Sequence, residues 1–338
     1  MNPAISVILL TTLIGVGQGL FLALFSAQSH ALVGLLPRTD DRAFLVQGSA
    51  IALLFLAAGL VASFFHLGRP ERAWRTAAMW RTSWLSREVI VLPGFMLAVA
   101  AYGAVHGLGW NPVIVTLGQG AALDAGVALG VAATVLAFAL FVCTAMIYAC
   151  LPFLAEWHSP LTLLNYTLLG GASGFTLASS LAAGLTSGLT AGLTITSAPH
   201  LVPFFAGWAI ALTVLAALGR FASLWRNARL KPKSTPQSAI GVKHPNVVQK
   251  SQGFMGSSFN TREFFHHRGA GTLRGVKWAF LLLTFALPLP CLALGLRDAS
   301  LGWLGVAFAV QYLGLLAERW FFFAQANHPQ NLYYQAVS

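Results

Sequence analysis

The chain has 338 residues, of which 57% are hydrophobic and only 9% are charged, and its mean hydropathy is +0.72. A soluble globular domain carries roughly 25% charged residues, so this composition excludes a water-soluble protein. The net charge of +11 is concentrated in loops between apolar runs, which is how membrane proteins encode orientation. We therefore expect a protein surrounded by membrane lipid that binds no nucleic acid.

Eight apolar runs follow one another along the chain, each suited to a helix that crosses about 30 Å of hydrocarbon. In chain order they cover residues 5–25, 48–65, 88–105, 120–148, 161–181, 201–224, 276–296 and 300–323. Small residues at 126–130 and 170–174 would let helices approach closely. The sequence predicts an all-α integral membrane protein, a bundle of about eight transmembrane helices forming a single membrane-anchor domain over 1–338.

Basic residues predict the orientation of the bundle. Eight spans place both chain ends on one side, together with the loops that hold most of the Lys and Arg. Of the 20 Lys and Arg, only Arg38, Arg42 and Arg297 would face the other side. By the positive-inside rule, the termini and basic loops are cytoplasmic. We expect a multi-pass protein of a bacterial inner (cytoplasmic) membrane.

One long hydrophilic loop covers residues 225–275. Its first half is rich in Lys, Pro, Ser and Gln, which predicts flexibility. Its second half mixes charges with Phe254, Phe259, Phe264 and Phe265. This mixture is typical of a segment that packs on another protein or on the membrane surface.

The densest group of polar and aromatic residues lies between the second and third runs. It reads HLGRPERAWR over 66–75 and WRTSWLSRE over 80–88. Gly68 and Pro70 would end the second helix just after His66, and Glu88 would lie in the first turn of the third. Such a fold can bring one imidazole and one carboxylate together at the membrane rim.

Structural roles account for the same residues equally well. A histidine in the last turn of a helix is favoured by the helix dipole, and Ser86 before Glu88 is typical of an N-cap followed by an acid. The arginines of the loop suit interfacial anchors, and Trp74, Trp80 and Trp84 suit an aromatic belt. The residues alone leave both interpretations open.

The strings HLGRPERAWR and SWLSRE resemble the membrane anchor subunit of DMSO reductase-type molybdoenzymes, the DmsC-like family. The strings ERWFFF at 318–323 and NLYY at 331–334, the chain length and the number of spans are also similar to that family. Within it, TTLIG at 11–15 and the loop 253–265 are most similar to the anchor subunit of cytoplasmic sulfite dehydrogenase, a sulfite:quinone oxidoreductase.

This resemblance implies a complex of a molybdopterin catalytic subunit, a ferredoxin-like iron–sulfur subunit with four clusters that docks on the cytoplasmic loops, and this anchor. The anchor would bind quinone, either ubiquinone or menaquinone, and pass electrons between the quinone pool and the iron–sulfur subunit in sulfite oxidation. The alternatives are the anchor of a DMSO-type reductase that oxidises menaquinol, and a structural anchor without a quinone site. The molybdenum half-reaction would not occur in this chain.

The resemblance also implies the residues of the quinone site. His66 and Glu88 are the implied catalytic residues. The implied cofactor-binding residues are His66, Gly68, Arg72, Trp74, Thr76 and Glu88. The chemistry fits, because a quinone exchanges two electrons and two protons, and histidine exchanges protons near neutral pH. A glutamate at the edge of the hydrocarbon can relay the second proton.

Other polar groups at membrane depth are further candidates. Asp124 lies near the outer end of the fourth run. Glu318 lies beside Arg319 near the cytoplasmic end of the eighth run, where we expect it to pair with an arginine. Candidate neighbours on the same rim are Glu156, His158, Asn165, Tyr166 and Tyr312.

Other cofactors and activities are disfavoured. No two of the nine histidines are suitably placed within spans to hold a haem, and Cys143, Cys150 and Cys291 are too widely spaced for a CxxC-type site. We therefore expect no haem, iron–sulfur cluster, molybdenum or other metal in this chain. A secondary transporter would show internal repeats and midplane charges, which this sequence lacks.

Overall fold

The computed structural model describes residues 1–37, 41–117, 121–184, 198–232, 234–248, 250 and 259–333. Three parts of the sequence used above lie outside the described residues: Arg38, the beginning of the 253–265 loop with Phe254, and Tyr334.

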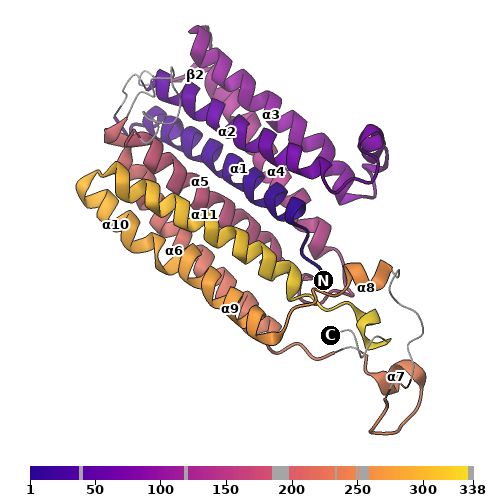
Figure 1. Ribbon diagram of the computed structural model, residues 1–338. Helices are drawn as coiled ribbons and strands as arrows, with labels where there is room; N and C mark the ends of the chain where they lie inside the picture. The colour runs from indigo at the N-terminus through magenta and orange to yellow at the C-terminus, as the bar shows by residue number, and fades with distance from the viewer. Residues whose placement is uncertain are drawn as a thin grey trace.

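Eight long helical segments make up the described bundle and run side by side in Figure 1. They are α1 (Ile5–Leu32), α2 (Arg42–Phe64), α3 (Trp84–Leu108), α4 (Ala125–Ala149), α5 (Pro160–Ala182), α6 (Val202–Asn227), a composite of α9 (Ala270–Leu281), η4 (Leu282–Ala286) and α10 (Pro288–Asp298), and α11 (Leu301–Ala324). The composite contains a π-helical turn before Pro288, because proline cannot donate the hydrogen bond that a regular helix requires.

Short elements connect these helices. They are η1 (Pro70–Met79), the antiparallel strands β1 (Val113–Leu117) and β2 (Ala121–Asp124), η3 (Pro199–Leu201), α7 (Pro236–Ile240), α8 (Phe259–Glu263) and η5 (Pro329–Tyr333). The fourth helix begins later than the predicted run 120–148, of which residue 120 lies outside the described residues. β2 covers Ala121–Asp124 and α4 begins at Ala125. Asp124 Oδ1 accepts a hydrogen bond of 2.8 Å from the Val127 amide, so that Asp124 is the N-cap of α4.

The start of the third helix also differs from the prediction. α3 begins at Trp84, one turn before Glu88, and its N-cap is Ser83, whose Oγ accepts a hydrogen bond from the Ser86 amide at 3.3 Å. The interpretation of Ser86 as the cap is therefore wrong, and Glu88 lies in the second turn. A carboxylate in the second turn cannot cap the helix, so tertiary contacts must account for the burial of Glu88.

The all-α membrane fold is confirmed. Within the described residues, seven helical segments are long and apolar enough to cross a membrane. The eighth, α5, is less apolar, yet 17 of its 23 residues are buried because it packs against α1, α4, α6 and α11. A helix that is surrounded by protein does not need the apolar surface that lipid demands.

Glycines set the contact between α1 and α5. A Cβ atom on Gly19 would lie 2.0 Å from the carbonyl oxygen of Gly170, and one on Gly174 would lie 2.0 Å from the carbonyl carbon of Gly19. Neither backbone can withdraw without moving its whole helix. The small residues predicted for close packing therefore bring the central helix into contact with α1.

One end of the bundle, which we call the terminal end, holds the N-terminus, α7, α8 and η5 (Figure 1). There, segments that are far apart in the sequence contact one another. The Asn2 amide donates to the Glu263 carbonyl at 2.9 Å, and the Phe264 ring stacks on His328 at 3.8 Å. Phe265 is buried as well. These aromatic residues are thus occupied within the chain, and docking of another protein on this loop stays a prediction.

The contact between α1 and α5 generates the first test. Gly174→Ala forces a methyl group into the backbone of α1, so we expect the free energy of unfolding to fall by about 1–3 kcal/mol. Thermal unfolding of the purified protein in mild detergent measures the change. Gly207→Ala is the matched control, because a Cβ on Gly207 meets no atom within 4 Å. Equal stability of the two variants would contradict the close contact.

Candidate functional site

The loop between α2 and α3 projects from the terminal end beside the rest of the bundle (Figure 1). It contains η1, a ten-residue helix with no buried residue. Trp74 is 71% exposed and Trp80 is 52% exposed. The guanidinium groups of Arg75 and Arg81 lie over these two rings at 5.5 and 5.3 Å. The loop therefore presents paired aromatic and cationic groups that nothing else in the described chain covers.

His66 lies just after α2 and is exposed. Among the described residues, no hydrogen bond engages its imidazole, whereas its backbone amide bonds back to Ser63. Neighbouring protein atoms still exclude some water from the imidazole, and this desolvation lowers the pKa of His66 below its usual value, because it disfavours the charged form. A neutral imidazole can donate from one nitrogen and accept at the other.

Three more of the predicted site residues lie at the same surface. Gly68 is exposed with open space around it. The Arg72 guanidinium is half exposed and lies 3.8 Å from the carboxylate of Glu71, and Thr76 in η1 is half-buried. Together with His66 and Trp74, these residues form one exposed segment at the terminal end.

Glu88 has a different environment. It is buried in α3, and its carboxylate accepts a hydrogen bond from the Thr144 hydroxyl on α4. It also lines a small internal cavity with Tyr166 and Arg319, which His66 does not reach. The structure therefore places Glu88 inside the bundle and His66 outside it. A single site that joins the six residues stays a prediction.

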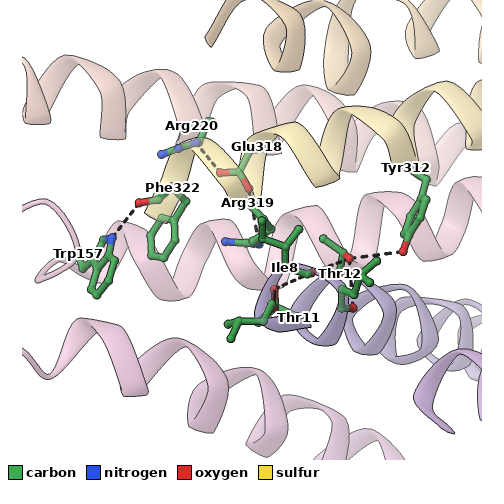
Figure 2. Close-up of polar contacts among 11 residues, drawn as sticks. Ile8, Thr11, Thr12, Trp157, Arg220, Tyr312, Glu318, Arg319 and Phe322 are labelled. Atoms are coloured by element: carbon green, nitrogen blue, oxygen red, sulfur yellow. Dashed lines mark hydrogen bonds and ion pairs between the residues drawn. The ribbon is translucent and has the colours of Figure 1, made fainter. Parts of the chain in front are cut away.

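A buried group of charges lies deeper in the same end (Figure 2). Arg220 Nε on α6 lies 2.7 Å from Glu318 Oε1 on α11, and Arg319 Nε lies 3.6 Å from Glu318 Oε2. Exposure of the three residues is 4% or less. The expected pairing of Glu318 with an arginine is confirmed. Charges buried to this extent require partners.

Aromatic rings surround both guanidinium groups. Arg319 lies 3.7 Å from the centre of the Tyr166 ring, and Arg220 lies 5.4 Å from that of Phe280. Such contacts stabilise a desolvated cation. From the sequence, Arg220 is grouped with the basic residues of the long loop, so its burial and its pairing with Glu318 are not predicted. The signal that could have found it is its position within the apolar run 201–224, where an unpaired charge would be costly.

The other candidate residues fall into two groups. Glu156, Asn165 and Tyr166 line a cavity with Arg220 and Glu318, so the structure brings them together. His158 and Tyr312 make separate contacts: His158 Nδ1 lies 2.6 Å from the Ala149 carbonyl, and the Tyr312 hydroxyl lies 3.5 Å from that of Thr12. Within the described chain, no group of three or more His, Cys, Asp and Glu could hold a metal ion.

Comparison with known proteins agrees with this architecture. Residues 1–228 match the family described as DMSO reductase anchor subunit (DmsC). The chain belongs to this family. It is also 52% identical to a sulfite dehydrogenase subunit of Allochromatium vinosum over 338 residues, which covers 100% of both chains. The resemblance predicted from the sequence is confirmed, and the chain is the membrane anchor subunit of an oxidoreductase complex.

The buried charges generate the second test. Glu318→Gln would leave two buried guanidinium groups without their anion, so we expect the free energy of unfolding to fall by about 3–5 kcal/mol. Denaturant unfolding in detergent measures it. Asp298→Asn is the matched control, because the pair of Asp298 with Arg297 is exposed and its loss should have no measurable effect. A Glu318→Gln protein as stable as the control would show that the buried pair contributes nothing.

Proposed function

We propose that this chain is the quinone-binding membrane anchor of a molybdopterin/iron–sulfur oxidoreductase, and that it passes electrons between the quinone pool and the iron–sulfur subunit in sulfite oxidation. One observation carries the proposal: the loop that holds His66 projects from the bundle and leaves the imidazole without a hydrogen bond in the described chain. The sulfite assignment is supported by the relative of matching length, which is named as a sulfite dehydrogenase subunit.

The residues of the loop fit a quinone. A quinone ring needs hydrogen-bond donors for its carbonyl oxygens and apolar surface for its faces and tail. His66 supplies a ring nitrogen, and Phe64, Phe65 and Trp74, which lie near it in the sequence, supply exposed apolar surface. When bound, the quinone supplies two-electron, two-proton redox chemistry. In this proposal His66 holds a carbonyl oxygen and exchanges a proton, and Gly68, Arg72 and Thr76 line the same loop.

Glu88 serves the proposed site from inside the bundle. Its carboxylate is held by Thr144 and is screened from bulk water by burial. A carboxylate in this environment can store a proton close to the membrane rim. Glu88 therefore acts as the proton reservoir of the site, while His66 acts at its surface.

The proposed partners dock at the terminal end. A ferredoxin-like subunit with four clusters would cover η1 and the 225–275 loop, and a molybdopterin subunit would bind to it. Exposed tryptophan and arginine, which η1 presents in pairs, are the residue types that dominate protein interfaces. The positive-inside rule supports a cytoplasmic position for this end in a bacterial inner membrane.

The second candidate is the anchor of a DMSO-type reductase that oxidises menaquinol, which the description of the matched family favours. The direction of electron flow separates the two. Sulfite-dependent reduction of a quinone by the purified complex supports the first candidate, and quinol-dependent reduction of DMSO supports the second.

Variants of His66 and Glu88 test the quinone site. His66→Ala removes a hydrogen bond to the quinone and Glu88→Gln removes a titrating group, so we expect at least about tenfold weaker binding of a quinol analogue or at least about tenfold slower quinone-coupled turnover in the assembled complex. Analogue titration and turnover with the natural donor measure these effects.

The matched controls are His200→Ala and Asp298→Asn, which alter exposed residues at the opposite end of the bundle. Wild-type binding and turnover in both site variants, in complexes that assemble fully, would refute the site. The chain would then be a structural anchor.

A variant of the η1 surface tests docking. Trp74→Ala removes a large exposed ring from the proposed interface, so we expect less iron–sulfur subunit to remain with the anchor during purification, with a loss of about 1–2 kcal/mol in affinity. Trp110→Ala is the control, because Trp110 is 67% exposed but follows α3 at the opposite end of the bundle. Equal retention in both variants would place the interface elsewhere.

A further inference from the structure

A layer of buried polar groups crosses the bundle at one depth. Its members come from five helices, and each lies four to seven residues inside the terminal end of its helix, which corresponds to roughly 6–11 Å at 1.5 Å per residue. They are Glu88 on α3, Thr144 on α4, Tyr166 on α5, Arg220 on α6, and Glu318 and Arg319 on α11. The layer thus extends from α6 to Glu88, the buried residue among those proposed for the quinone site.

Three hollows follow this layer and share lining residues. The outermost is an open groove of about 800 Å³ lined by Glu156 and Asn227, among others. The same two residues line a cavity of about 10 Å³ that reaches inward to Tyr166 and Arg319. Tyr166 and Arg319 in turn line a second cavity of about 20 Å³ that contains Glu88. The three hollows are therefore neighbours: Glu156 and Asn227 lie between the groove and the first cavity, and Tyr166 and Arg319 lie between the first cavity and the one that contains Glu88.

Buried polar atoms along this series lack partners. The oxygens Asn165 Oδ1 and Tyr166 Oη and the nitrogen Arg220 Nη2 are buried without a hydrogen bond to any described residue, and all three residues line the cavity of about 10 Å³. Buried polar atoms in proteins are almost always hydrogen-bonded, to ordered water if not to protein. The cavity of about 10 Å³ is lined mostly by polar residues. The cavity of about 20 Å³ has a more apolar lining, but it also contains Glu88, Thr144, Tyr166 and Arg319. Each is about large enough for one water molecule. Water is therefore the ligand that these atoms require.

We propose that the two cavities hold ordered water and, with the Tyr166 hydroxyl, form a proton-transfer route from the groove at Glu156 to the carboxylate of Glu88. Each water or hydroxyl oxygen accepts a proton and releases one of its own to the next oxygen. The last proton forms the O–H bond of the Glu88 carboxyl group. One proton moves inward for each one taken from solvent, and no electron is transferred.

Three charged side chains line the first cavity. Arg220 and Arg319 carry two positive charges against the single negative charge of Glu318. The other polar groups near Glu88 are Thr144, Cys143, Tyr148 and Tyr166. Neither arginine transfers a proton, because guanidinium groups stay protonated.

The test is proton exchange at Glu88, which requires no quinone and so is independent of the proposed function. The full chain, purified in lipid vesicles, is studied by infrared spectroscopy over a pH series. The carboxyl C=O band of Glu88 is identified by its loss in Glu88→Gln. At a pH where this band is present, the buffer is changed from H₂O to D₂O, and the shift of the band gives the exchange rate.

Two variants interrupt the route. Tyr166→Phe removes the hydroxyl at the junction of the two cavities while keeping the ring under Arg319. Asn165→Leu places an apolar group in the outer cavity, and Ser223, its present partner, keeps its own bond to Gly219. We expect each variant to slow exchange at Glu88 by at least about tenfold. Thr134→Val, on α4 and outside the lining of both cavities, should exchange at the wild-type rate.

Exchange as fast in Tyr166→Phe and Asn165→Leu as in the wild type would overturn the route, because the proton would then reach Glu88 another way. A Glu88 band that does not shift in the wild type, or that is absent at every pH at which the protein is folded, would also overturn it. The two variants act independently, so poor folding of one leaves the other decisive.

Discussion

The structure depends on one constraint: a charge inside the hydrocarbon needs a partner within the protein. The chain meets this constraint with the Arg220–Glu318 contact, which links α6 to α11, and with Arg319, which lies over the ring of Tyr166 on α5. These contacts hold α5, α6 and α11 together near the terminal end. The same constraint explains why Glu88, on the opposite side of the bundle, faces inward to Thr144 and not outward to lipid.

The central helix α5 makes this arrangement possible. Its glycines bring α1 into backbone contact, and its polar residues Asn165 and Tyr166 lie where the buried charges meet the cavities. A strongly apolar helix would be stable in contact with lipid, but it would offer no hydrogen-bonding groups to those buried charges. The reduced hydropathy of α5 is thus a consequence of its place in the centre of the bundle.

The terminal end separates two kinds of chemistry. The loop between α2 and α3, which contains η1 and is called the η1 loop here, holds exposed aromatic rings, guanidinium groups and the imidazole of His66. These groups suit contact with a partner subunit and a quinone. The interior holds carboxylates, hydroxyls and water-sized cavities, which suit the movement of protons. Glu88 lies in α3, which begins directly after the η1 loop, so the two regions meet at this helix. In the proposed function, this arrangement would keep the electron path and the proton path apart until they reach the proposed site.

The sequence by itself determined the membrane environment, the helical class, the loops and the family, because these follow from apolar runs about one bilayer long and from local motifs. It also found the residues of the η1 loop. Only the tertiary structure decided that Ser83 and Asp124 cap their helices, that α5 is central, and that Arg220 pairs with Glu318. It also placed Glu88 beside Thr144 and apart from His66. The reason is physical: hydropathy is a local property, whereas the partner of a buried charge depends on how distant helices pack together.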